Sequence, residues 1–410
     1  MQYTISKADK ILKGEIMLPS SKSISNRILI INSLSYSPYE IENLSDSDDT
    51  RVMEAVLNAN TNHFDVGHAG TAMRFLTAFL SKIAGEWTLT GSERMLQRPI
   101  GILVDALREL GASIEYTQNE GFPPLRILGT SLKGGTLTLD GSVSSQYISA
   151  LLMIAPTIPG GLTLKLLNQI ASKPYIELTL NLMMTFGVGH KWSGYEIRIE
   201  EQTYRPVKFA VESDWSGASY WYAMAALCEK CDLLLKGLHL QSIQGDASQC
   251  EWFSTYFGVQ SRQEGNDVRL TKVKTKKIEI IELDFIENPD IAQTFAVLAV
   301  CRNLPFHFKG LTTLKIKETD RIAALKTELS KFGATLTEPS TGELAWDGTI
   351  DPSLINHTAV IETYHDHRMA LAFAPAALVY PQIVILDPNV ITKSYPAYWE
   401  DMKKVGFTIN

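Results

Sequence analysis

The sequence predicts an α/β fold of two domains that are built from a repeated unit. The chain has 410 residues, which is too long for one ordinary hydrophobic core. Hydrophobic residues make up 45% and charged residues 20% of the chain, the balance of a globular protein. One pattern also recurs along the sequence: an amphipathic helix, then a glycine, then a strand. This order of elements indicates mixed sheets with helices between their strands.

Five glycines mark the repeat. They recur at intervals of roughly seventy residues, at Gly111, Gly187, Gly258, Gly333 and Gly406. A glycine with positive φ ends a helix and turns the chain into the next strand. Strand-like stretches such as GGTLTLDGS, LTLKLLNQ and EIRIEEQ lie between the helical ones. The pattern therefore predicts a series of supersecondary units of similar size.

The first unit is predicted to be shortened. By the same spacing, a further unit would end near residue 36, but a predicted helix from about Asp49 to Asn58 leads quickly into NTNHFDVGHAG. Six units, one of them shortened, divide into two domains of three. We expect the chain to cross between the domains near residues 211–214, which fall close to the middle of the sequence.

The net charge and the composition exclude several classes of function. The formal net charge of -7 argues against general nucleic-acid binding, so a basic cluster here indicates a small anionic substrate. The start MQYTISKADK lacks the apolar core of a signal peptide, and no apolar stretch approaches membrane-spanning length. We therefore expect a cytoplasmic protein. The four cysteines do not form a disulfide framework, and for Cys228 and Cys231 packing is favoured over metal or redox chemistry.

The segment LPSSKSISNR carries the first candidate site. Two serines precede apolar positions at helical spacing, so the segment predicts a turn that opens a helix. Free backbone N–H groups at a helix start attract anions. Lys22, Ser23 and Arg27 can face one anion, such as a phosphate or a carboxylate. The alternative is an ordinary capped helix with a solvated Lys and Arg, and the segment alone does not decide between them.

Two further segments in the first half of the chain also place a candidate anion-binding residue at a predicted helix start. GHAGTAMRF places Gly70 at a helix start, where a ligand can approach the backbone, and Arg74 points either to a ligand or to a structural carboxylate. QRPIG places Arg98 before a helix that begins at Pro99 or Ile100. Arg98 suits bidentate binding of an anion. A plain turn and a surface arginine are the competing interpretations.

Hydroxyl groups gather at two more helix starts. DGSVSSQYISALLM places Ser144, Ser145 and Gln146 at the mouth of an apolar helix, where they form either a phosphate cradle or a simple N-cap. SKPYIELTL repeats the arrangement with Ser172 and Tyr175.

The second half adds charged residues. KETDR contains Lys317, Glu318 and Arg321 at a helix start, and ENPDIAQTFAV places Asp290 before a helix as an N-cap or a general base. The remaining candidates are Arg368, in YHDHRMALAFA, and Lys393, in TKSYP. His365 and His367 have no third metal ligand at a convincing spacing. Helix starts of this kind, in one cleft and without a Walker or dinucleotide fingerprint, predict a small substrate with several anionic groups.

The chain resembles the 5-enolpyruvylshikimate-3-phosphate synthase family from about Leu18 to Pro396. The motifs stand in the family's order: LPSSKSISNR, AGTAMR, QRPIG, DGSVSSQ, SKPYI, IKETDR, DHRMA and TKSYP. The resemblance implies a two-domain, inside-out α/β barrel of six βαβαββ-type repeats, the first shortened, with pseudo-threefold symmetry in each domain. It implies domains of residues 21–211 and of residues 1–20 with 212–410, and an active-site cleft between them.

The resemblance also implies the reaction. The enolpyruvyl group of phosphoenolpyruvate is transferred to the 5-hydroxyl of shikimate 3-phosphate and phosphate is released, in chorismate and aromatic amino-acid biosynthesis. No metal, organic cofactor, nucleic-acid partner or membrane partner is implied, and a monomer that is a target of glyphosate is expected. Asp290 is implied as the base and Glu318 as the group that exchanges protons with the methylene carbon, with Lys22 and Lys393 completing the catalytic set.

The implied binding residues follow from the motif matches. Those for shikimate 3-phosphate are Lys22, Ser23, Arg27, Ser144, Ser145, Gln146, Ser172, Tyr175, Asp290, Thr313 and Lys317. Those for phosphoenolpyruvate are Lys22, Gly70, Arg98, Gln146, Arg321, Arg368 and Lys393.

Some positions depart from the family's pattern. Ser20 replaces a common Gly, His68 a usual Asn and Phe75 a common Pro, and these changes leave glyphosate sensitivity open. Thr313 stands where the family usually has an Asn that contacts the shikimate ligand.

Two other functions compete with this one. The related enzyme that acts on a UDP-amino sugar typically has a reactive Cys in its first half, whereas all four cysteines of this chain lie in the second half. A non-catalytic anion-binding protein is the other alternative. The set of candidate catalytic residues argues against that alternative, and phosphate release would decide it.

Overall fold

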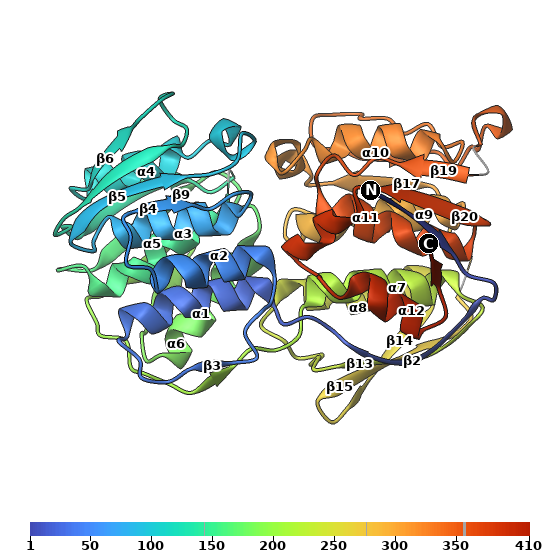
Figure 1. Ribbon diagram of the computed structural model, residues 1–410, viewed down its shortest axis with the longest axis horizontal. Helices are drawn as coiled ribbons and strands as arrows, with labels where there is room; N and C mark the ends of the chain where they lie inside the picture. Colours follow the sequence, from blue (N-terminus) through green and yellow to red (C-terminus); the bar gives the residue numbers. More distant parts are fainter. Residues whose placement is uncertain (143, 276, 356–357) are drawn as a thin grey trace. The chain divides into compact units, whose positions relative to one another are not determined.

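The computed structural model describes residues 1–142, 144–275, 277–355 and 358–410, so Val143 of the DGSVSSQ motif lies outside the described residues. These residues form two compact units (Figure 1). The outer unit comprises Met1–Pro19 and Glu212–Asn410, and the inserted unit comprises Ser20–Val211. Within the described ranges, no helix combines the length and the apolar character needed to cross a membrane.

The inserted unit contains two four-stranded sheets and one two-stranded sheet, with strand orders β4-β5-β7-β6, β10-β11-β9-β8 and β12-β3. Its elements are α1 (Lys22–Leu34), β3 (Ile41–Glu42), α2 (Asp48–Leu57), β4 (His63–Asp65), α3 (Gly70–Leu80), β5 (Gly85–Thr90), α4 (Gly101–Glu109), β6 (Ser113–Tyr116), β7 (Leu125–Gly129), β8 (Gly135–Asp140), α5 (Ser145–Ile154), β9 (Leu162–Leu167), α6 (Lys173–Thr185), β10 (Lys191–Ser193), β11 (Glu196–Ile199) and β12 (Phe209–Ala210). In each four-stranded sheet two parallel strands, joined through a helix, are followed by a second helix and an antiparallel hairpin. Each is thus a βαβαββ unit.

The first repeat is shorter, as the sequence predicts. Strand β3 pairs in parallel with β12, with Ile41 opposite Phe209 and Glu42 opposite Ala210. Helices α1 and α2 are present, but α2 is followed within a few residues by β4, the first strand of the next sheet. This repeat therefore keeps its parallel strand pair and both helices and lacks the hairpin. Its first strand, β12, comes from the far end of the unit.

The outer unit contains three sheets, with strand orders β14-β15-β13-β2, β16-β17-β18 and β19-β20-β1-β21. Its elements are β1 (Gln2–Ser6), β2 (Ile11–Met17), α7 (Trp215–Leu227), β13 (Lys230–Lys236), α8 (Gln249–Phe257), β14 (Val259–Glu264), β15 (Asp267–Lys272), β16 (Ile281–Asp284), α9 (Ala292–Cys301), β17 (Phe306–Lys309), α10 (Arg321–Ser330), β18 (Leu344–Trp346), β19 (Thr358–Ile361), α11 (His367–Phe373), β20 (Gln382–Leu386), α12 (Tyr398–Lys404) and β21 (Thr408–Ile409). Strand β2 pairs in parallel along all of β13, and β1 lies between β20 and β21. The N-terminal residues therefore complete two sheets of this unit.

Short 3-10 helices occur in both units: η1 (Met95–Gln97), η2 (Ala155–Thr157), η3 (Gly245–Ser248), η4 (Pro289–Ile291), η5 (Thr312–Ile316), η6 (Pro352–Leu354), η7 (Ala374–Leu378) and η8 (Pro388–Lys393). Two of them, η1 and η5, directly precede the candidate residues Arg98 and Lys317, and η4 and η8 contain Asp290 and Lys393.

The glycine pattern is confirmed, with one difference. All five repeat glycines have φ between +67° and +95° just after a helix. After four of them the chain enters a strand, but after Gly333 it forms only isolated bridges, Ala334 to Ile350 and Thr337 to Ala345. The sheet β16-β17-β18 correspondingly has three strands, one fewer than the other two sheets of this unit.

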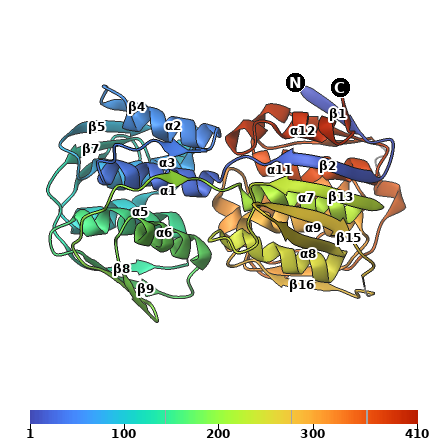
Figure 2. The same cartoon turned by 90° about the horizontal axis from the view of Figure 1, so that it is seen from below.

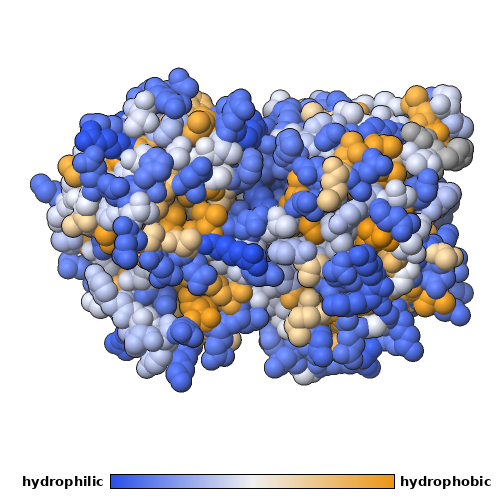
Figure 3. All heavy atoms as spheres, in the orientation of Figure 1, coloured by the Kyte–Doolittle hydropathy of each residue, from blue (hydrophilic) through white to orange (hydrophobic). Residues whose placement is uncertain are grey.

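Each unit is built around three central helices (Figure 2). In the inserted unit α1, α3 and α5 pack against one another, and in the outer unit α9 packs against α7 and α11. All residues of α9 and α11 are buried, and nearly all of α7. Helices that are apolar on every side form the centre of a domain. On the face shown in Figure 3, hydrophobic residues occur in small groups separated by hydrophilic ones. Many of the candidate site residues lie at the N-terminal ends of these helices and of their neighbours, whereas Thr313 and Lys393 lie within 3-10 helices.

Candidate active site

In the inserted unit, α1 begins at Lys22. The side chain of Ser21 caps the helix by accepting a hydrogen bond from the Ile24 backbone N–H at 3.4 Å. The Lys22 ammonium lies 3.7 Å from the Asp49 carboxylate at the start of α2. Lys22 and Asp49 thus bring the starts of α1 and α2 together. The predicted helix start in LPSSKSISNR is confirmed, and its cation has a carboxylate partner.

Arg27 braces α1 against its neighbours. Its guanidinium donates to Thr179 Oγ1 at 2.7 Å, to Ser149 Oγ at 3.2 Å, and to the Ser23 and Tyr175 carbonyl oxygens at 2.8 and 3.3 Å. It also lies over the Phe75 ring, 5.3 Å from the centroid. Burial lowers the pKa of Arg27 to about 10. The structure therefore gives Arg27 a set of partners on α5 and α6 within its own unit.

Gly70 and Arg98 form a close contact. Gly70 is the first residue of α3, and Arg98 directly follows η1. A Cβ atom at position 70 would lie 2.5 Å from Arg98 Nη1 and 2.9 Å from Cζ. Only a residue without a side chain fits this position with the guanidinium where it is. Helix α4, predicted to begin at Pro99 or Ile100, begins at Gly101.

Backbone carbonyl oxygens orient Arg74. Its guanidinium donates to the carbonyl oxygens of Gly70 at 3.1 Å and of Pro99 at 3.2 Å. Arg74 therefore ties the start of α3 to the segment that follows Arg98. That Arg74 also points to a ligand or to a structural carboxylate stays a prediction. The nearby substituted residue His68 hydrogen bonds through Nδ1 to Ser92 Oγ at 2.9 Å.

The hydroxyl clusters lie at the starts of α5 and α6. Ser144 is the N-cap of α5, and its side chain accepts from the Gln146 N–H at 3.3 Å. Gln146 Nε2 in turn donates to Thr71 Oγ1 on α3 at 3.2 Å. Ser145 is largely buried at the first position of α5. Ser172 precedes α6 in the left-handed conformation, with φ +56°. These contacts bring the starts of α3 and α5 together.

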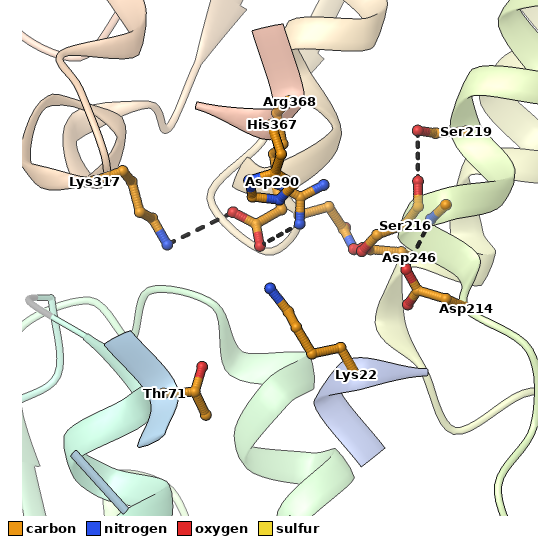
Figure 4. A network of polar contacts seen from close by, with 12 residues as sticks. Lys22, Thr71, Asp214, Ser216, Ser219, Asp246, Asp290, Lys317, His367 and Arg368 are labelled. Carbon is orange, nitrogen blue, oxygen red and sulfur yellow. Dashed lines mark hydrogen bonds and ion pairs between the residues drawn. The ribbon is translucent and has the colours of Figure 1, made fainter. Parts of the chain in front are cut away.

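In the outer unit, Asp290 lies among three cations. Its carboxylate is 2.9 Å from Arg368 Nη2, 3.2 Å from Arg321 Nη1 and 3.6 Å from Lys317 Nζ. Figure 4 shows the carboxylate between Lys317 and Arg368. Burial alone raises the pKa of Asp290, but Arg368, Lys317 and Arg321 together hold it well below its usual value. The alternative role as an N-cap is wrong, because Ile291 occupies that position of α9.

Arg321 is the centre of this cluster. It is the first residue of α10 and is almost fully buried. Besides Asp290, its guanidinium donates to Asp366 Oδ2 at 2.7 Å and to Glu318 Oε2 at 2.9 Å. Burial lowers the pKa of Arg321, and the three carboxylates, with Asp366 the strongest, outweigh it and raise the pKa. The guanidinium is therefore fixed in place by opposite charges on three sides.

The remaining outer-unit candidates join the same cluster. Lys393, at the end of η8, forms a close ion pair with Glu318. Arg368 Nη1 lies 3.3 Å from the Tyr220 hydroxyl on α7, and burial raises the pKa of Tyr220 to about 12 in spite of the nearby Arg368. Thr313 Oγ1 is buried and has no hydrogen-bond partner among the described residues.

Sequence reasoning missed three supporting groups. Asp366 caps α11 by accepting from the Arg368 N–H at 2.9 Å while it holds Arg321. Tyr220 contacts Arg368, and the buried Asp246 bonds to Ser216 Oγ and to Asn288 Nδ2, two residues before Asp290. Asp366 lies inside the DHRMA motif, next to the candidate residue Arg368, and this position could have marked it as a site residue. Tyr220 and Asp246 come from distant segments, where no motif marks them. The described residues contain no cluster of three or more His, Cys, Asp or Glu placed to hold a metal.

Comparison with known proteins decides the family. The model of the family described as EPSP synthase (3-phosphoshikimate 1-carboxyvinyltransferase) matches residues 6–59 and 54–402. The chain belongs to the EPSP synthase family. It is 53% identical to the 3-phosphoshikimate 1-carboxyvinyltransferase of Bacteroides fragilis strain NCTC 9343, a match that covers 100% of this chain and 99% of that protein. It is 38% identical to the protein of the same name from Vibrio cholerae, over 97% of this chain and 98% of the relative.

Solved structures agree with this fold. The EPSP synthase of Acinetobacter baumannii matches with a TM-score of 0.78 at 21% identity, covering 100% of this chain and 99% of that chain. The enolpyruvyl transferase NikO of Streptomyces tendae matches with a TM-score of 0.76 at 16% identity, covering 100% and 98%. At these identities the likeness shows the two-domain α/β fold alone. Family membership makes this EPSP synthase homologue a transferase that carries out enolpyruvyl transfer in aromatic biosynthesis.

Proposed function

We propose that the side chains gathered in each unit take part in transferring the enolpyruvyl group of phosphoenolpyruvate to the 5-hydroxyl of shikimate 3-phosphate. Family membership supports the reaction. The observation that carries the residue assignment is the cluster of the outer unit, in which Asp290 and Glu318 are held by Arg321, Arg368, Lys317 and Lys393. Two carboxylates beside several cations provide proton carriers and anion-binding groups in one place.

Shikimate 3-phosphate is proposed to bind mainly to the inserted unit. Hydroxyl groups and backbone N–H groups at the starts of α1, α5 and α6 suit its phosphate and ring hydroxyls. The proposed residues are Lys22, Ser23, Arg27, Ser144, Ser145, Gln146, Ser172, Tyr175, Asp290, Thr313 and Lys317. Because Arg27 already donates to four groups of its own unit, we expect it to act chiefly by holding Ser23 and Tyr175 in position.

Phosphoenolpyruvate is proposed to bind to cations of both units. The proposed residues are Lys22, Gly70, Arg98, Gln146, Arg321, Arg368 and Lys393. An anionic substrate at Arg321 and Arg368 competes with Asp290 for the same guanidinium groups. Weaker pairing raises the pKa of Asp290 toward the range of a useful base. Substrate binding would thereby prepare Asp290 for proton transfer.

The proton transfers can then be assigned. In this scheme Glu318, which lies beside Lys393, takes up a proton before the reaction. Its protonated form donates that proton to the methylene carbon of phosphoenolpyruvate, and the 5-hydroxyl oxygen attacks the neighbouring carbon while Asp290 accepts the hydroxyl proton. The product of this step is a tetrahedral intermediate. A proton then leaves its methyl group for Glu318, the carbon–oxygen bond to the phosphate breaks, and phosphate departs with the proton held by Asp290. No cofactor enters this scheme.

We also propose that the enzyme is a cytoplasmic monomer and that glyphosate competes with phosphoenolpyruvate. The close contact between Gly70 and Arg98 supports a compact anion site that suits this small inhibitor. Glyphosate inhibition measured at several phosphoenolpyruvate concentrations tests the competition, and light scattering tests the monomer. Inhibition that does not weaken as phosphoenolpyruvate increases would contradict a shared site.

Phosphate release from phosphoenolpyruvate, with and without shikimate 3-phosphate, tests the function. We expect release that depends on shikimate 3-phosphate. In Asp290→Ala, calorimetry should still detect binding of shikimate 3-phosphate, and the turnover rate should fall by a factor of roughly 10²–10⁴, the usual contribution of a general base. Glu287 is an exposed carboxylate on the same segment, so Glu287→Gln is the control and should keep the turnover rate of the parent.

Each outcome of this experiment separates two interpretations. Near-normal turnover of the Asp290→Ala enzyme would remove Asp290 from the role of base. Binding of both substrates by the unmodified chain without phosphate release would favour the non-catalytic anion-binding protein.

A further inference from the structure

A buried carboxylate is bonded to the segment that carries Asp290. Asp246 belongs to η3 and is 3% exposed. Its Oδ1 atom accepts a hydrogen bond from Asn288 Nδ2 at 3.0 Å, and its Oδ2 atom accepts a close hydrogen bond from Ser216 Oγ. In the view of Figure 4, Asp246 and Ser216 lie on the other side of Asp290 from Lys317. Asp246 thus connects three segments: η3, the start of α7 and the residue that precedes η4.

Asn288 fixes the start of the turn that holds Asp290. Its backbone N–H donates to the Phe285 carbonyl oxygen at 3.1 Å, and its own carbonyl oxygen accepts from the Ile291 N–H at 3.3 Å. The side-chain amide of Asn288 donates to Asp246. Because Asp290 follows two residues later in the same turn, a displacement of Asn288 also displaces the Asp290 carboxylate.

Glutamines on both sides of η3 fix it to the start of α7. Gln244 Oε1 accepts from the Trp215 backbone N–H at 3.2 Å, and Gln244 Nε2 donates to the Ser213 carbonyl oxygen at 2.8 Å. After η3, Gln249 Nε2 donates to the Trp215 carbonyl oxygen at 2.7 Å. A site side chain keeps its geometry only when the groups behind it are themselves held in place. Asp246 therefore acts from a fixed support.

The same helix also contacts the surroundings of Asp290 from two further residues. Ser219 Oγ lies 3.2 Å from Thr294 Oγ1 on α9, the helix that follows Asp290. The Tyr220 hydroxyl lies 3.3 Å from Nη1 of Arg368, whose Nη2 pairs with Asp290. The first two turns of α7 thus join the support of the carboxylate to the cation that faces it.

The carboxylate of Asp246 has a donor on each oxygen. Burial raises its pKa, and the hydrogen bonds from Ser216 and Asn288 act in the opposite direction because they favour the charged form. A buried polar group that is bonded in this way makes its surroundings rigid. The contact with Asn288 is therefore suited to fixing one position of the turn.

We propose that Asp246 is a positioning residue, which holds residues 288–291 so that the Asp290 carboxylate can accept the proton of the attacking hydroxyl. The inference rests on the proposed function, in which Asp290 is the base. Because Asp246 acts through Asp290, its loss should change kcat more than the KM for phosphoenolpyruvate. A misplacement of about 1 Å can lower a rate by roughly a hundredfold.

An exchange of the two side chains tests the proposal. In Asn288→Asp, two carboxylates meet where a donor and an acceptor are 3.0 Å apart, so the turn should be displaced. We expect kcat for phosphate release to fall roughly tenfold to a hundredfold, with little change in the KM for phosphoenolpyruvate. In the double variant Asp246→Asn with Asn288→Asp, the amide and the carboxylate exchange places, and the amide oxygen can still accept from Ser216. Most of the lost kcat should return.

Two further comparisons separate positioning from a general loss of stability. Asp401 is a similarly buried carboxylate of the same unit, which accepts from the Tyr395 hydroxyl at 2.8 Å. Asp246→Ala and Asp401→Ala should both lower the Tm, but only Asp246→Ala should lower kcat. In a chain that already carries Asp290→Ala, Asp246→Ala should cause no further loss of kcat.

Three outcomes would overturn the proposal. The first is a kcat of Asn288→Asp equal to that of the parent, and the second is a double variant that regains the Tm but not kcat. The third is an equal loss of kcat from Asp246→Ala with and without Asp290→Ala, since Asp246 would then act independently of the base. The exchange variants carry the test even if Asp246→Ala does not fold. A parent that releases no phosphate would overturn the proposed function, and this inference with it, whereas the three outcomes above concern Asp246 alone.

Discussion

At the scale of single residues, Gly70 shows how a missing side chain shapes the candidate site. A Cβ atom at this position would overlap the Arg98 guanidinium, with Nη1 at 2.5 Å. In Gly70→Ala the guanidinium has to move, so we expect the KM for phosphoenolpyruvate to rise roughly tenfold, which corresponds to about 1.4 kcal/mol of binding, with little change in thermal stability. Steady-state phosphate release measures this.

Gly135→Ala is the matched control for Gly70→Ala. A Cβ atom at position 135 meets no atom within 4 Å, so the same chemical change is made in open space. An unchanged KM in Gly70→Ala, or an equal change in both variants, would show that the contact with Arg98 does not position a substrate-binding group.

The ionisation of Asp290 predicts how the stability of the fold depends on pH. Its folded-state pKa is depressed, so its ionised form stabilises the fold. That contribution is complete above the unfolded pKa of about 4 and is lost as the pH falls through the lower folded value. We expect Asp290→Asn to have a lower Tm than the parent at neutral pH, because Arg368, Arg321 and Lys317 lose their shared counter-charge. The difference should narrow below about pH 4.

Thermal unfolding by circular dichroism at several pH values measures this difference. Glu287→Gln removes an exposed carboxylate from the same segment and should follow the parent at every pH. A Tm difference between the parent and Asp290→Asn that stays constant down to pH values near 3 would mean that the carboxylate is not held in its ionised form by the cations.

At the scale of elements, two helices of the outer unit are capped by an aspartate in different environments. Asp320 caps α10 by accepting from the backbone N–H groups of Ile322 and Ala323, both at 3.1 Å. Asp366 caps α11 and also binds the buried Arg321 through both of its carboxylate oxygens. Asp320→Ala should therefore cost about 1 kcal/mol, the usual effect of losing an N-cap. Asp366→Ala should cost about 3–5 kcal/mol, because a buried charge loses its partner.

Chemical denaturation of both variants gives the comparison. Each substitution removes one capping carboxylate, so the difference between their free energies of unfolding isolates the contact with Arg321. Equal losses would mean that Glu318 and Asp290 suffice to hold Arg321.

The elements also show what local sequence can predict. Capping side chains and the repeat glycines act over a few residues, so the helix starts at Lys22 and Arg321 could be predicted from the residues next to them. The hydrogen-bond partners of the site side chains could not be predicted in this way. Arg27 bonds to Thr179, 152 positions away, and Arg321 to Asp366, 45 positions away. Such pairs depend on how the repeats pack, which no local pattern encodes.

At the scale of the whole molecule, the two units depend differently on chain continuity. The inserted unit is continuous from Ser20 to Val211 and has its own hydrophobic core. The outer unit is assembled from both ends of the chain, since β2 pairs with β13 along its full length and β1 lies between β20 and β21. The sequence repeats suggested two domains of three units, but they did not reveal which segment completes each sheet.

The last prediction follows from this connectivity. A fragment of residues 20–211 retains every sheet and the whole core of its unit, so we expect it to fold alone and unfold cooperatively. A fragment of residues 212–410 lacks β1 and β2, which leaves β13 without its parallel neighbour and separates β20 from β21, and exposed strand edges promote aggregation. Circular dichroism and size-exclusion chromatography compare the two. We expect that adding a peptide of residues 1–19 restores the folding of the 212–410 fragment. If this fragment folds without the peptide as well as residues 20–211 do, the N-terminal strands are not needed to complete the outer unit.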